Sequence, residues 1–402
     1  MLPDQSHLSL PFFDATHRQL GRDVGAWVAA IAPGIDESDD RAACRTWVSA
    51  LGEAGYLRWC VPATFGGALD ALDSRSLVVL RETLAFYSPL ADFAFAMQGL
   101  GSGAITLAGS AEQKHTYLNA VARGDKIAAF ALSEPGAGSD AGALTTTARK
   151  TADGWVLNGE KTWISNGGIA DFYCVFAKTE PDAGTRGISA FIVDADAAGL
   201  DASRHIPVMA PHPLATVMLR DCAVPQTALL GAPNGGFKLA MQTLDIFRAS
   251  VAGAALGFAR RALLEATRHA QSRRMFGHTL ADFQLTQAKL GQMAADIDAG
   301  ALLTYRAAWL RDDAVARGSS SRISAEPAMA KMTATENAQR VIDAALQMHG
   351  GLGVRVGSKI ESLYRDIRSL RIYEGATEVQ QLIIGKHVLA TASTVDTKGS
   401  DA

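Results

Sequence analysis

The chain has 402 residues and 48% of them are hydrophobic, so it is long enough for about two or three domains with a large buried core. Lysine and arginine number 38, aspartate and glutamate 41, and the net charge of −3 argues against a nucleic-acid partner. Four widely spaced cysteines argue against a zinc site, no metal is expected, and the lack of a signal peptide or a membrane-length apolar run predicts a soluble, cytoplasmic protein with no membrane partner.

Residues 1–125 are predicted to be helical. Two stretches, "RSLVVLRETLAFY" and "EQKHTYLNAVARG", place apolar residues three and four positions apart. Gly124 closes the second stretch as a helix stop. We therefore expect an N-terminal helical domain.

Residues 126–237 change to short segments that are rich in aromatic and β-branched residues. They read "KIAAFAL", "GWVLNGEKTWIS", "DFYCVFAKT" and "GISAFIVDA", and turn residues such as Asp153-Gly154 and Asn166-Gly167 separate them. This zone is predicted to be a middle β domain.

From residue 238 the helical period returns and continues to 392. Leu290, Met293 and Ile297 share one face of a long helix, a Ser/Gly break covers "RGSSSR", and a further helix spans about 325–348. Residues 393–402 are predicted to be a disordered tail. The order of helices, strands and helices predicts an α+β multidomain protein in which two helical zones pack around an inserted β domain.

Two glycine-containing turns follow predicted strands in the β zone. In "ALSEPGAGSD", glycines let backbone N–H groups approach a ligand and Ser133 and Ser139 add hydroxyls, although an ordinary polar turn explains the same residues. In "GEKTWISNGG", Trp163 and Ser165 offer an aromatic wall and a hydroxyl suited to a planar cofactor. A core tryptophan beside a hairpin turn is the alternative.

Two helix junctions in the last zone also carry polar groups. In "SRRMFGHTLADFQ", Arg273 and Gln284 could serve a phosphate and a sugar or base edge, with Phe276 between them, although a solvated basic turn is the alternative. In "QMHGGLGV", Gln347 ends a helix and Gly351 follows it, and helix C-capping alone explains the glycines.

The segment "LRIYEGATEVQQLIIG" places Glu374 after an apolar run and directly before Gly375. Because the preceding residues, Ile372 among them, are apolar, we expect this carboxylate to be poorly solvated, with a surface-loop carboxylate as the alternative. Thr377 and Gln380 have the spacing of a capping box, which predicts a helix from 378.

Together these segments resemble the motif set of the FAD-dependent acyl-CoA dehydrogenase family, whose signatures read like "SEPGAGSD", "WISNG", "R-x-x-FG" and "IYEGATE". The resemblance covers nearly the whole chain. It implies an N-terminal helical domain, a middle β-barrel domain and a C-terminal four-helix bundle, with FAD as cofactor and a homotetramer built as a dimer of dimers.

The resemblance also implies site residues. The flavin ring would be lined by Phe130, Ser133, Trp163 and Ser165, and the same FAD would be reached by Thr377 and Glu378. The adenine and pyrophosphate end of the FAD in a neighbouring subunit would be held by Arg273, Phe276, Gln284, Gln347 and Gly351. The substrate would contact Ser139, Arg248 and Gly375.

For catalysis, the resemblance implies that Glu374 removes the α-proton of an acyl thioester while the β-hydrogen leaves as hydride to flavin N5. A base for so weak a carbon acid must be stronger than a solvated glutamate of pKa about 4.3, and partial burial raises a carboxyl pKa. Gly375 would leave room for the substrate, the Glu374 N–H would polarise the thioester oxygen, and Arg248 would position the base.

Three features narrow the substrate. Phe247 occupies the position where some branches of the family place the base and cannot act as one, which leaves Glu374. The stretch "SPLADFAFAMQGLGSGAI" has no arginine to meet a second carboxylate, so an uncharged acyl chain is expected. In "APHPLAT", His212 and Leu214 replace an arginine and a serine that many members have near the CoA nucleotide, and Thr216 is retained.

The expected activity is acyl-CoA dehydrogenation, with an electron-transferring flavoprotein as electron acceptor and a place in fatty acid metabolism. The departure at "APHPLAT" leaves an acyl group on a carrier protein open. An oxygen-using oxidase on the same fold and a nucleic-acid-binding flavoprotein are further alternatives, and the net charge of −3 argues against the latter. Acyl length, branching and pathway cannot be predicted from the sequence.

Overall fold

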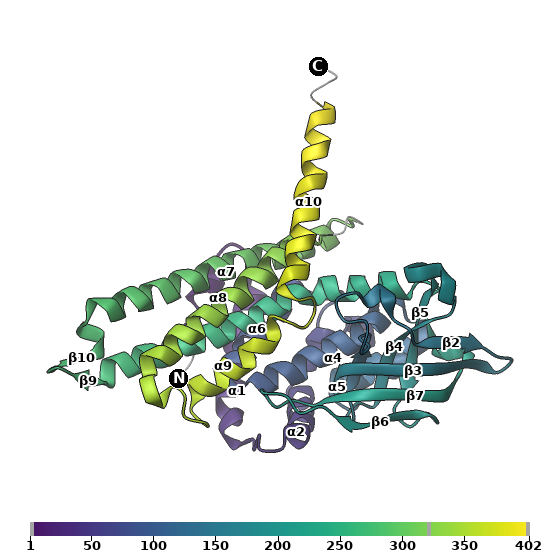
Figure 1. The fold of residues 1–402 in the computed structure, drawn as a ribbon, viewed down its shortest axis with the longest axis horizontal. Helices are drawn as coiled ribbons and strands as arrows, with labels where there is room; N and C mark the ends of the chain where they lie inside the picture. Colours follow the sequence, from purple (N-terminus) through teal and green to yellow (C-terminus); the bar gives the residue numbers. More distant parts are fainter. Residues whose placement is uncertain (1–3, 320–322, 399–402) are drawn as a thin grey trace. The chain divides into compact units, whose positions relative to one another are not determined.

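The structure is a computed structural model that describes residues 4–319 and 323–398. By their contacts these residues form two compact units. The colours of Figure 1 follow the sequence, so the segments of each unit can be located by their residue numbers. The first unit joins the residues up to Ala30 with Ser74–Pro89 and the chain from Arg248 onward. The second comprises Ile31–Asp73 and Leu90–Phe247. The predicted class, helical parts around a sheet-forming part, is confirmed by the element order.

The first unit is built mainly from long helices. They are α1 (Ala15–Ile31), α3 (Ser74–Tyr87), α6 (Gly236–Ser272, from Arg248 on), α7 (Gln284–Ala316), α8 (Ala325–His349), α9 (Lys359–Leu370) and α10 (Thr377–Lys398). Helices α7 and α8 pack along each other, α3 packs on α7, and α9 and α10 pack on α8 (Figure 1). A short hairpin of β9 (Arg274–Met275) and β10 (His278–Thr279) joins α6 to α7.

Glycines let α3 and α6 approach each other closely in this unit. A Cβ at Gly257 would lie 2.2 Å from the Glu82 carbonyl oxygen, and one at Gly253 would lie 2.9 Å from the Val78 carbonyl oxygen. The buried Glu82 carboxylate accepts from Arg260 Nε at 2.5 Å and from the hydroxyl of Tyr305 at 2.9 Å. The contact therefore combines backbone-to-backbone packing with a fully compensated buried charge.

The second unit places helices before and beside one eight-stranded sheet. Its helices are α2 (Asp40–Glu53), α4 (Pro89–Ala108, from Leu90 on) and α5 (Ala111–Arg123). Its strands are β1 (Ala128–Ala131), β2 (Thr147–Lys150), β3 (Gly154–Ser165), β4 (Phe172–Lys178), β5 (Ile188–Asp194), β6 (Leu200–His205), β7 (Leu214–Pro225) and β8 (Leu229–Leu230).

The sheet order is β6-β7-β3-β2-β4-β5-β8, and β1 pairs in parallel with β4. Strands β4 and β5 are antiparallel neighbours and are buried at nearly every position, so both of their faces are covered. This explains their continuous apolar sequences, since a strand covered on both faces has no polar side to alternate with.

Two predicted helix boundaries, the stop at Gly124 and the start at 378, agree with the structure within one residue, but only one of the predicted caps is formed. Helix α5 has a capping box of Ser110 and Gln113 at its start and Gly124, at φ 77°, after its end, so the stop predicted at Gly124 is confirmed. The capping box predicted from Thr377 and Gln380 is wrong. Thr377 Oγ1 donates instead to Glu336 Oε1 at 2.6 Å, and Gln380 Nε2 donates to the Gly375 carbonyl at 2.8 Å. These side chains therefore form hydrogen bonds with other partners in place of the local cap.

Helix α10 runs to Lys398, so the predicted disordered tail, 393–402, begins inside a helix, and its last four residues lie outside the described residues. The predicted break at 317–322 follows the end of α7, and 320–322 also lie outside the described residues. Among the described helices, none combines the length and apolar character needed to cross a bilayer.

Candidate functional site

The loop between α9 and α10 carries the candidate base, Glu374. Its backbone φ is 54°, a left-handed conformation that is uncommon for a residue with a side chain, and Gly375 follows at 95°. The Gly375 carbonyl accepts from Lys331 Nζ and from Gln380 Nε2, both at 2.8 Å. The Glu374 carbonyl accepts more weakly, from Gln380 Nε2 at 3.4 Å and from Arg248 Nε at 3.5 Å. Three buried side chains from three helices therefore hold this turn.

Gly375 is required by this geometry. A Cβ there would lie 2.4 Å from Gln380 Nε2, and the positive φ disfavours any L side chain. The family resemblance explains Gly375 by the room that the substrate needs. The structure adds a second reason, which is the close approach of the Gln380 side chain.

The surroundings of Glu374 differ from the prediction. Both carboxylate oxygens are shielded from solvent, as expected. Ile372, however, is 57% exposed, so the expected apolar shelter from this residue is wrong. The carboxylate lies instead near cationic groups. Among the neighbours of the buried Lys331, Glu374 raises the pKa of that lysine most, and Arg248 donates to the Glu374 carbonyl. A cationic environment favours the carboxylate form of a glutamate, whereas an apolar one favours the acid.

The start of α10 is tied to α8 by a polar cluster. Glu336 accepts from Thr377 Oγ1 at 2.6 Å and from Arg371 Nε at 2.8 Å. These donors lower the pKa of Glu336 against the opposing effect of its burial. Glu378 follows in the first turn of α10 and is exposed. The cluster fixes the entry of α10 and so the loop that carries Glu374.

A second group of predicted site residues lies at the other end of α8. His269, near the end of α6, stacks on His349 at the end of α8, with ring centroids 4.3 Å apart. This contact places the exposed Arg273 and Phe276 of the hairpin region at the same end as Gln347 and Gly351. Gln284 opens α7 beside the hairpin.

The spacing along α8 separates the two groups. Lys331 and Gln347 are sixteen positions apart, which is about 24 Å along a helix at 1.5 Å per residue. Within the first unit, Arg273 and Gln347 are therefore remote from Glu374 and Thr377.

In the second unit, a break in the sheet turns Trp163 outward. The register of β3 against β7 shifts between Lys161 and Ile164, and Trp163 has φ 59°. Such bulges redirect a side chain. Trp163 is 60% exposed, so the alternative of a core tryptophan is wrong.

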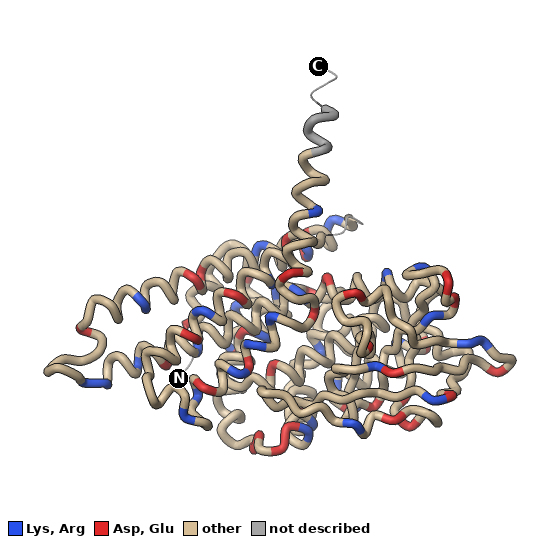
Figure 2. Tube along the Cα trace, in the orientation of Figure 1, with Lys and Arg blue, Asp and Glu red and all other residues tan. Residues whose placement is uncertain are grey.

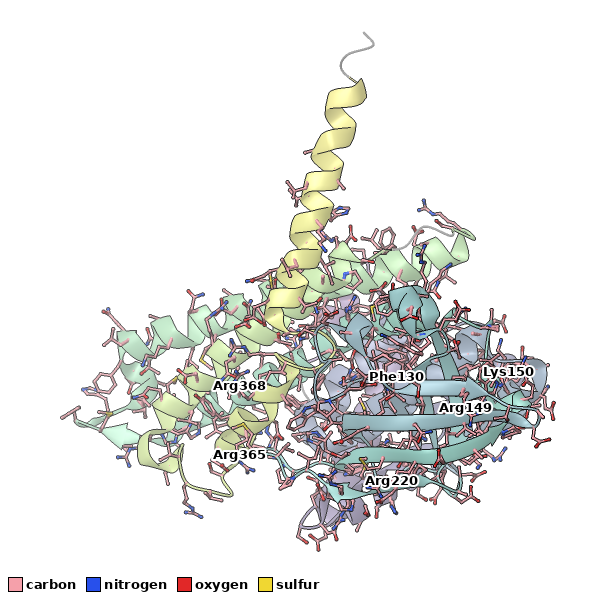
Figure 3. The ribbon with its side chains drawn as sticks, turned by 45° about the vertical axis from the view of Figure 1, so that its right-hand side comes forward. Phe130, Arg149, Lys150, Arg220, Arg365 and Arg368 are labelled. Atoms are coloured by element: carbon pink, nitrogen blue, oxygen red, sulfur yellow. The ribbon has the colours of Figure 1, made fainter. Side chains whose placement is uncertain are left out.

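The neighbouring residues of the same unit come from β1 and the turn after it. Phe130, labelled in Figure 3, lies in β1. Its ring packs against that of Phe176 in β4, with 4.9 Å between the ring centroids. The Thr162 N–H donates to the Ser133 carbonyl at 2.9 Å, which brings Ser133 beside the strand of Trp163 and Ser165. Ser139 lies exposed further along the turn.

A buried ion pair supports this turn. Lys161 Nζ donates to Glu134 Oε1 at 2.8 Å and to the Leu132 carbonyl at 3.1 Å. Glu134 also accepts from the N–H groups of Thr145 and Thr146, at 2.6 and 2.9 Å. Burial alone would raise the pKa of Glu134, but Lys161 and these donors lower it to about 2.

Two further predictions concern α4. A Cβ at Gly99 or Gly103 would lie 2.7 or 2.9 Å from the ring of Phe247, so this ring packs directly on the helix backbone. His212 packs against Phe93 of the same helix, with centroids 4.7 Å apart, and its Nδ1 lies 2.8 Å from the Ala210 carbonyl. Burial lowers the pKa of His212, so this histidine does not supply the charge of an arginine.

The exposed groups fit a planar cofactor with a phosphate end. Trp163 and Phe276 each present a large aromatic ring to solvent, 60% and 83% exposed, where aromatic rings are usually covered. Ser133 and Ser165 supply hydroxyls near Trp163, and the exposed Arg273 supplies a guanidinium near Phe276.

The sequence analysis missed Lys331, Gln380, Lys161 and Glu134 as functional supports. A signal existed for Lys331. It shares its helix face with Thr335, Ala338 and Ile342, all buried, so the helical period already places a lysine on an apolar face. No comparable signal points from Lys331 to the loop at 374–375, because that contact spans 44 residues of sequence.

Family models for the acyl-CoA dehydrogenase N-terminal, middle and C-terminal domains match residues 14–125, 129–222 and 234–389. A solved structure of an acyl-CoA dehydrogenase complexed with FAD, from Bacillus anthracis, is 32% identical with a TM-score of 0.88, and covers 96% of this chain and 68% of that one.

Three curated relatives differ in their named reactions. A 3-(aryl)acrylate reductase of Clostridium sporogenes is 39% identical over 94% of this chain and 100% of its own length. The mitochondrial short-chain specific acyl-CoA dehydrogenase of Mus musculus is 40% identical over 85% and 82%. The CarC subunit of the caffeyl-CoA reductase-Etf complex of Acetobacterium woodii is 38% identical over 84% and 88%.

Proposed function

We propose, from the premise that this chain belongs to the acyl-CoA dehydrogenase family of FAD-dependent oxidoreductases, that it dehydrogenates an uncharged acyl thioester between its α and β carbons with Glu374 as the base. The observation that carries the proposal is a solvent-shielded carboxylate on a left-handed turn held by Lys331, Gln380 and Arg248. Such a carboxylate is positioned before substrate arrives and does not need to be desolvated during the reaction.

The protein's part in the reaction is a proton transfer. Glu374 accepts the α-proton, and the C–H electron pair passes into the forming α,β double bond. Bound FAD supplies the acceptor for the hydride that leaves the β carbon. Arg248 contributes by its contact with the Glu374 carbonyl, which steadies the backbone from which the carboxylate extends.

The cofactor contacts proposed for this chain are those given above, since the exposed aromatic and basic groups fit them. Ser133, Trp163 and Ser165 would meet the flavin end and Arg273, Phe276 and Gln347 the adenine and pyrophosphate end. Lys331, which contacts the loop that carries Glu374 and leads to Thr377, lies about 24 Å along α8 from Gln347. This separation supports the proposal that Thr377 and Gln347 serve different FAD molecules. A complete site would then need a second subunit, which favours the proposed homotetramer.

The proposed acyl chain is uncharged because the segment around α4 brings no arginine to it. Coenzyme A is proposed as the usual carrier. A protein-tethered acyl group is a second candidate, favoured by two observations: His212 packs on Phe93 and does not supply an arginine's charge, and Thr216 is buried.

The proposed electron partner is an electron-transferring flavoprotein, as the name of the CarC relative suggests for that protein. Two of the relatives are named reductases, so the proposed chemistry at Glu374 includes the reverse direction, in which the protonated residue returns a proton to the α carbon. An oxidase using oxygen is distinguished by its turnover with oxygen alone. Positively and negatively charged positions are intermixed along the described chain, which gives the nucleic-acid alternative no support (Figure 2).

The decisive experiment is Glu374→Gln. The purified holoprotein is mixed anaerobically with butyryl-, octanoyl- and 3-phenylpropionyl-CoA, and flavin absorbance is followed. Loss of a general base commonly lowers a rate by about 10²–10⁴, so the wild type should bleach and the variant should stay yellow while still binding thioester. Glu53→Gln, at an exposed carboxylate ending α2, is the matched control and should bleach normally.

Bleaching of Glu374→Gln at the wild-type rate would show that another residue is the base. Failure of every CoA thioester to bleach wild-type protein, with success of the same acyl groups on a carrier protein, would favour the second candidate.

A further inference from the structure

The Gly375 carbonyl and a buried ammonium form a contact that the proposed reaction does not by itself require. Lys331 is fully buried in α8, and its Nζ donates to Gly375 O at 2.8 Å. A buried ammonium is costly unless charged and polar groups compensate it. A neutral amide or a water could satisfy one carbonyl at lower cost, so the charge itself calls for an explanation.

The charged groups around Lys331 point to Glu374. Burial lowers the pKa of Lys331 to about 8, and Glu374 is the strongest influence in the opposite direction. Arg248 of α6 and Arg371 after α9 also lower the pKa of Lys331, and Glu336 of α8 raises it. Glu336 is already engaged by Arg371 and Thr377. Lys331 and the candidate base are therefore electrostatically coupled.

The same lysine also bears on the backbone of the base. A positive φ angle is unfavourable for Glu374, which has a side chain, and such a conformation persists where surrounding contacts fix it. Lys331 and Gln380 fix the second carbonyl of this turn.

We propose that Lys331 is a positioning residue for Glu374, which holds the turn that presents the carboxylate and keeps that carboxylate ionised by its fixed positive charge. This inference rests on the proposed function. In the forward reaction the proton passes from the α carbon to a Glu374 oxygen, and Lys331 keeps its own proton throughout. The ammonium favours the ionised base before the reaction and opposes retention of the proton afterwards, so it promotes release of that proton at the end of each turnover.

The test replaces the charge and follows the proton. Lys331→Met and Lys331→Gln are neutral, and the glutamine keeps a donor for Gly375. Lys331→Arg keeps the charge. Each holoprotein is incubated in D₂O with butyryl-, octanoyl- and 3-phenylpropionyl-CoA, and α-hydrogen exchange is measured by mass spectrometry across pH 5–9. Exchange reports on the base without any electron acceptor. Anaerobic flavin bleaching across the same range is the second readout.

A nearby opposite charge lowers a carboxyl pKa by about 1–3 units. In the neutral variants the acidic limb of the exchange profile, where exchange falls as Glu374 becomes protonated, should therefore move up by about one pH unit. At a pH below the limb of both proteins, exchange relative to its plateau should then fall about tenfold. Lys331→Arg should keep the wild-type limb. Lys161→Met removes another fully buried lysine, one that pairs with Glu134, and should leave the limb unmoved even where the rate falls.

An unmoved limb in both neutral variants, or a limb that moves equally in Lys331→Arg, would overturn the inference. So would failure of both neutral variants to fold with FAD, because Lys331 would then be explained by stability alone. Loss of exchange in Glu374→Gln together with an unmoved limb would reject the role of Lys331 while keeping the proposed function. Exchange that survives in Glu374→Gln would reject the proposed function itself.

Discussion

The ion pair of Glu134 and Lys161 can be tested by removing its negative charge. Glu134→Gln changes the volume little, but it leaves the ammonium of Lys161 buried without its carboxylate and turns an amide N–H₂ toward donors that need an acceptor. Breaking a buried pair from one side costs about 3–5 kcal/mol, and we expect the unfolding free energy to fall by an amount in this range.

The pH dependence follows from the pKa of Glu134. This pKa is lowered from 4.5 to about 2 in the folded protein. A carboxylate with a depressed folded pKa stabilises the fold above its unfolded pKa, and that contribution is lost as the pH falls toward the folded value. By pH 4 about 1 kcal/mol of it should be gone, so wild type and variant should differ by about 1 kcal/mol less at pH 4 than at pH 7.

The assay is urea unfolding followed by circular dichroism at both pH values, for wild type, Glu134→Gln, Lys161→Met and the double variant. A direct contact should give a coupling energy of about 0.5–3 kcal/mol. Because the pair supports the turn at Ser133, the single variants should also lose FAD more readily on dialysis. The reasoning would be refuted by a coupling energy near zero between the two substitutions, together with an equal stability difference between wild type and Glu134→Gln at pH 4 and pH 7. The ion pair would then add nothing to the stability of the fold.

Two further substitutions test the other parts of the site. Arg273→Ala should weaken FAD binding by about 1.5–3 kcal/mol, the value of a charge-assisted hydrogen bond. FAD occupancy after dialysis measures this loss, and Arg274→Ala in the adjacent strand should show none. Equal FAD retention in both variants would make Arg273 a solvated turn residue. Gly375→Ala should destabilise the protein by about 1–3 kcal/mol, because the new Cβ would lie 2.4 Å from Gln380 Nε2 on a backbone with a φ of 95°. The variant should also lose α-hydrogen exchange while FAD stays bound. Exchange at the wild-type rate would contradict the tight turn.

The sequence predicted those elements whose side chains carry a clear period. The stretch 154–165 was predicted as a strand and is β3, and 75–87 matches α3 within one residue. Strand β7, Leu214–Pro225, was not predicted as a strand, because a charged Arg220-Asp221 pair interrupts its apolar pattern. Helix α4 lies in the zone that was predicted to be helical, but its bounds were not predicted, because it is apolar nearly all round and has no polar face to reveal a period.

For the candidate site, the local sequence and the family resemblance pointed to Glu374 and Gly375, and the structure shows which side chains hold their turn. Lys331 and Arg248 reach the loop from 44 and 126 residues away, and contacts at such separations leave no local pattern. Trp163 was recognised as an aromatic wall or a core residue, and the bulge that decides between these, between Lys161 and Ile164, depends on pairing with β7.

These contacts change the physical account of the proposed base. An apolar shelter would make Glu374 a stronger base by raising its pKa, and the sequence suggested such a shelter. The observed neighbours, Lys331 and Arg248, favour the ionised carboxylate and so oppose a large increase in basicity. The barrier to removing an α-proton must then be lowered mainly at the other end of the substrate, by donors that stabilise negative charge on the thioester oxygen. In the proposed mechanism, the cations keep Glu374 ionised and fixed, and polarisation of the substrate carbonyl would activate the carbon acid.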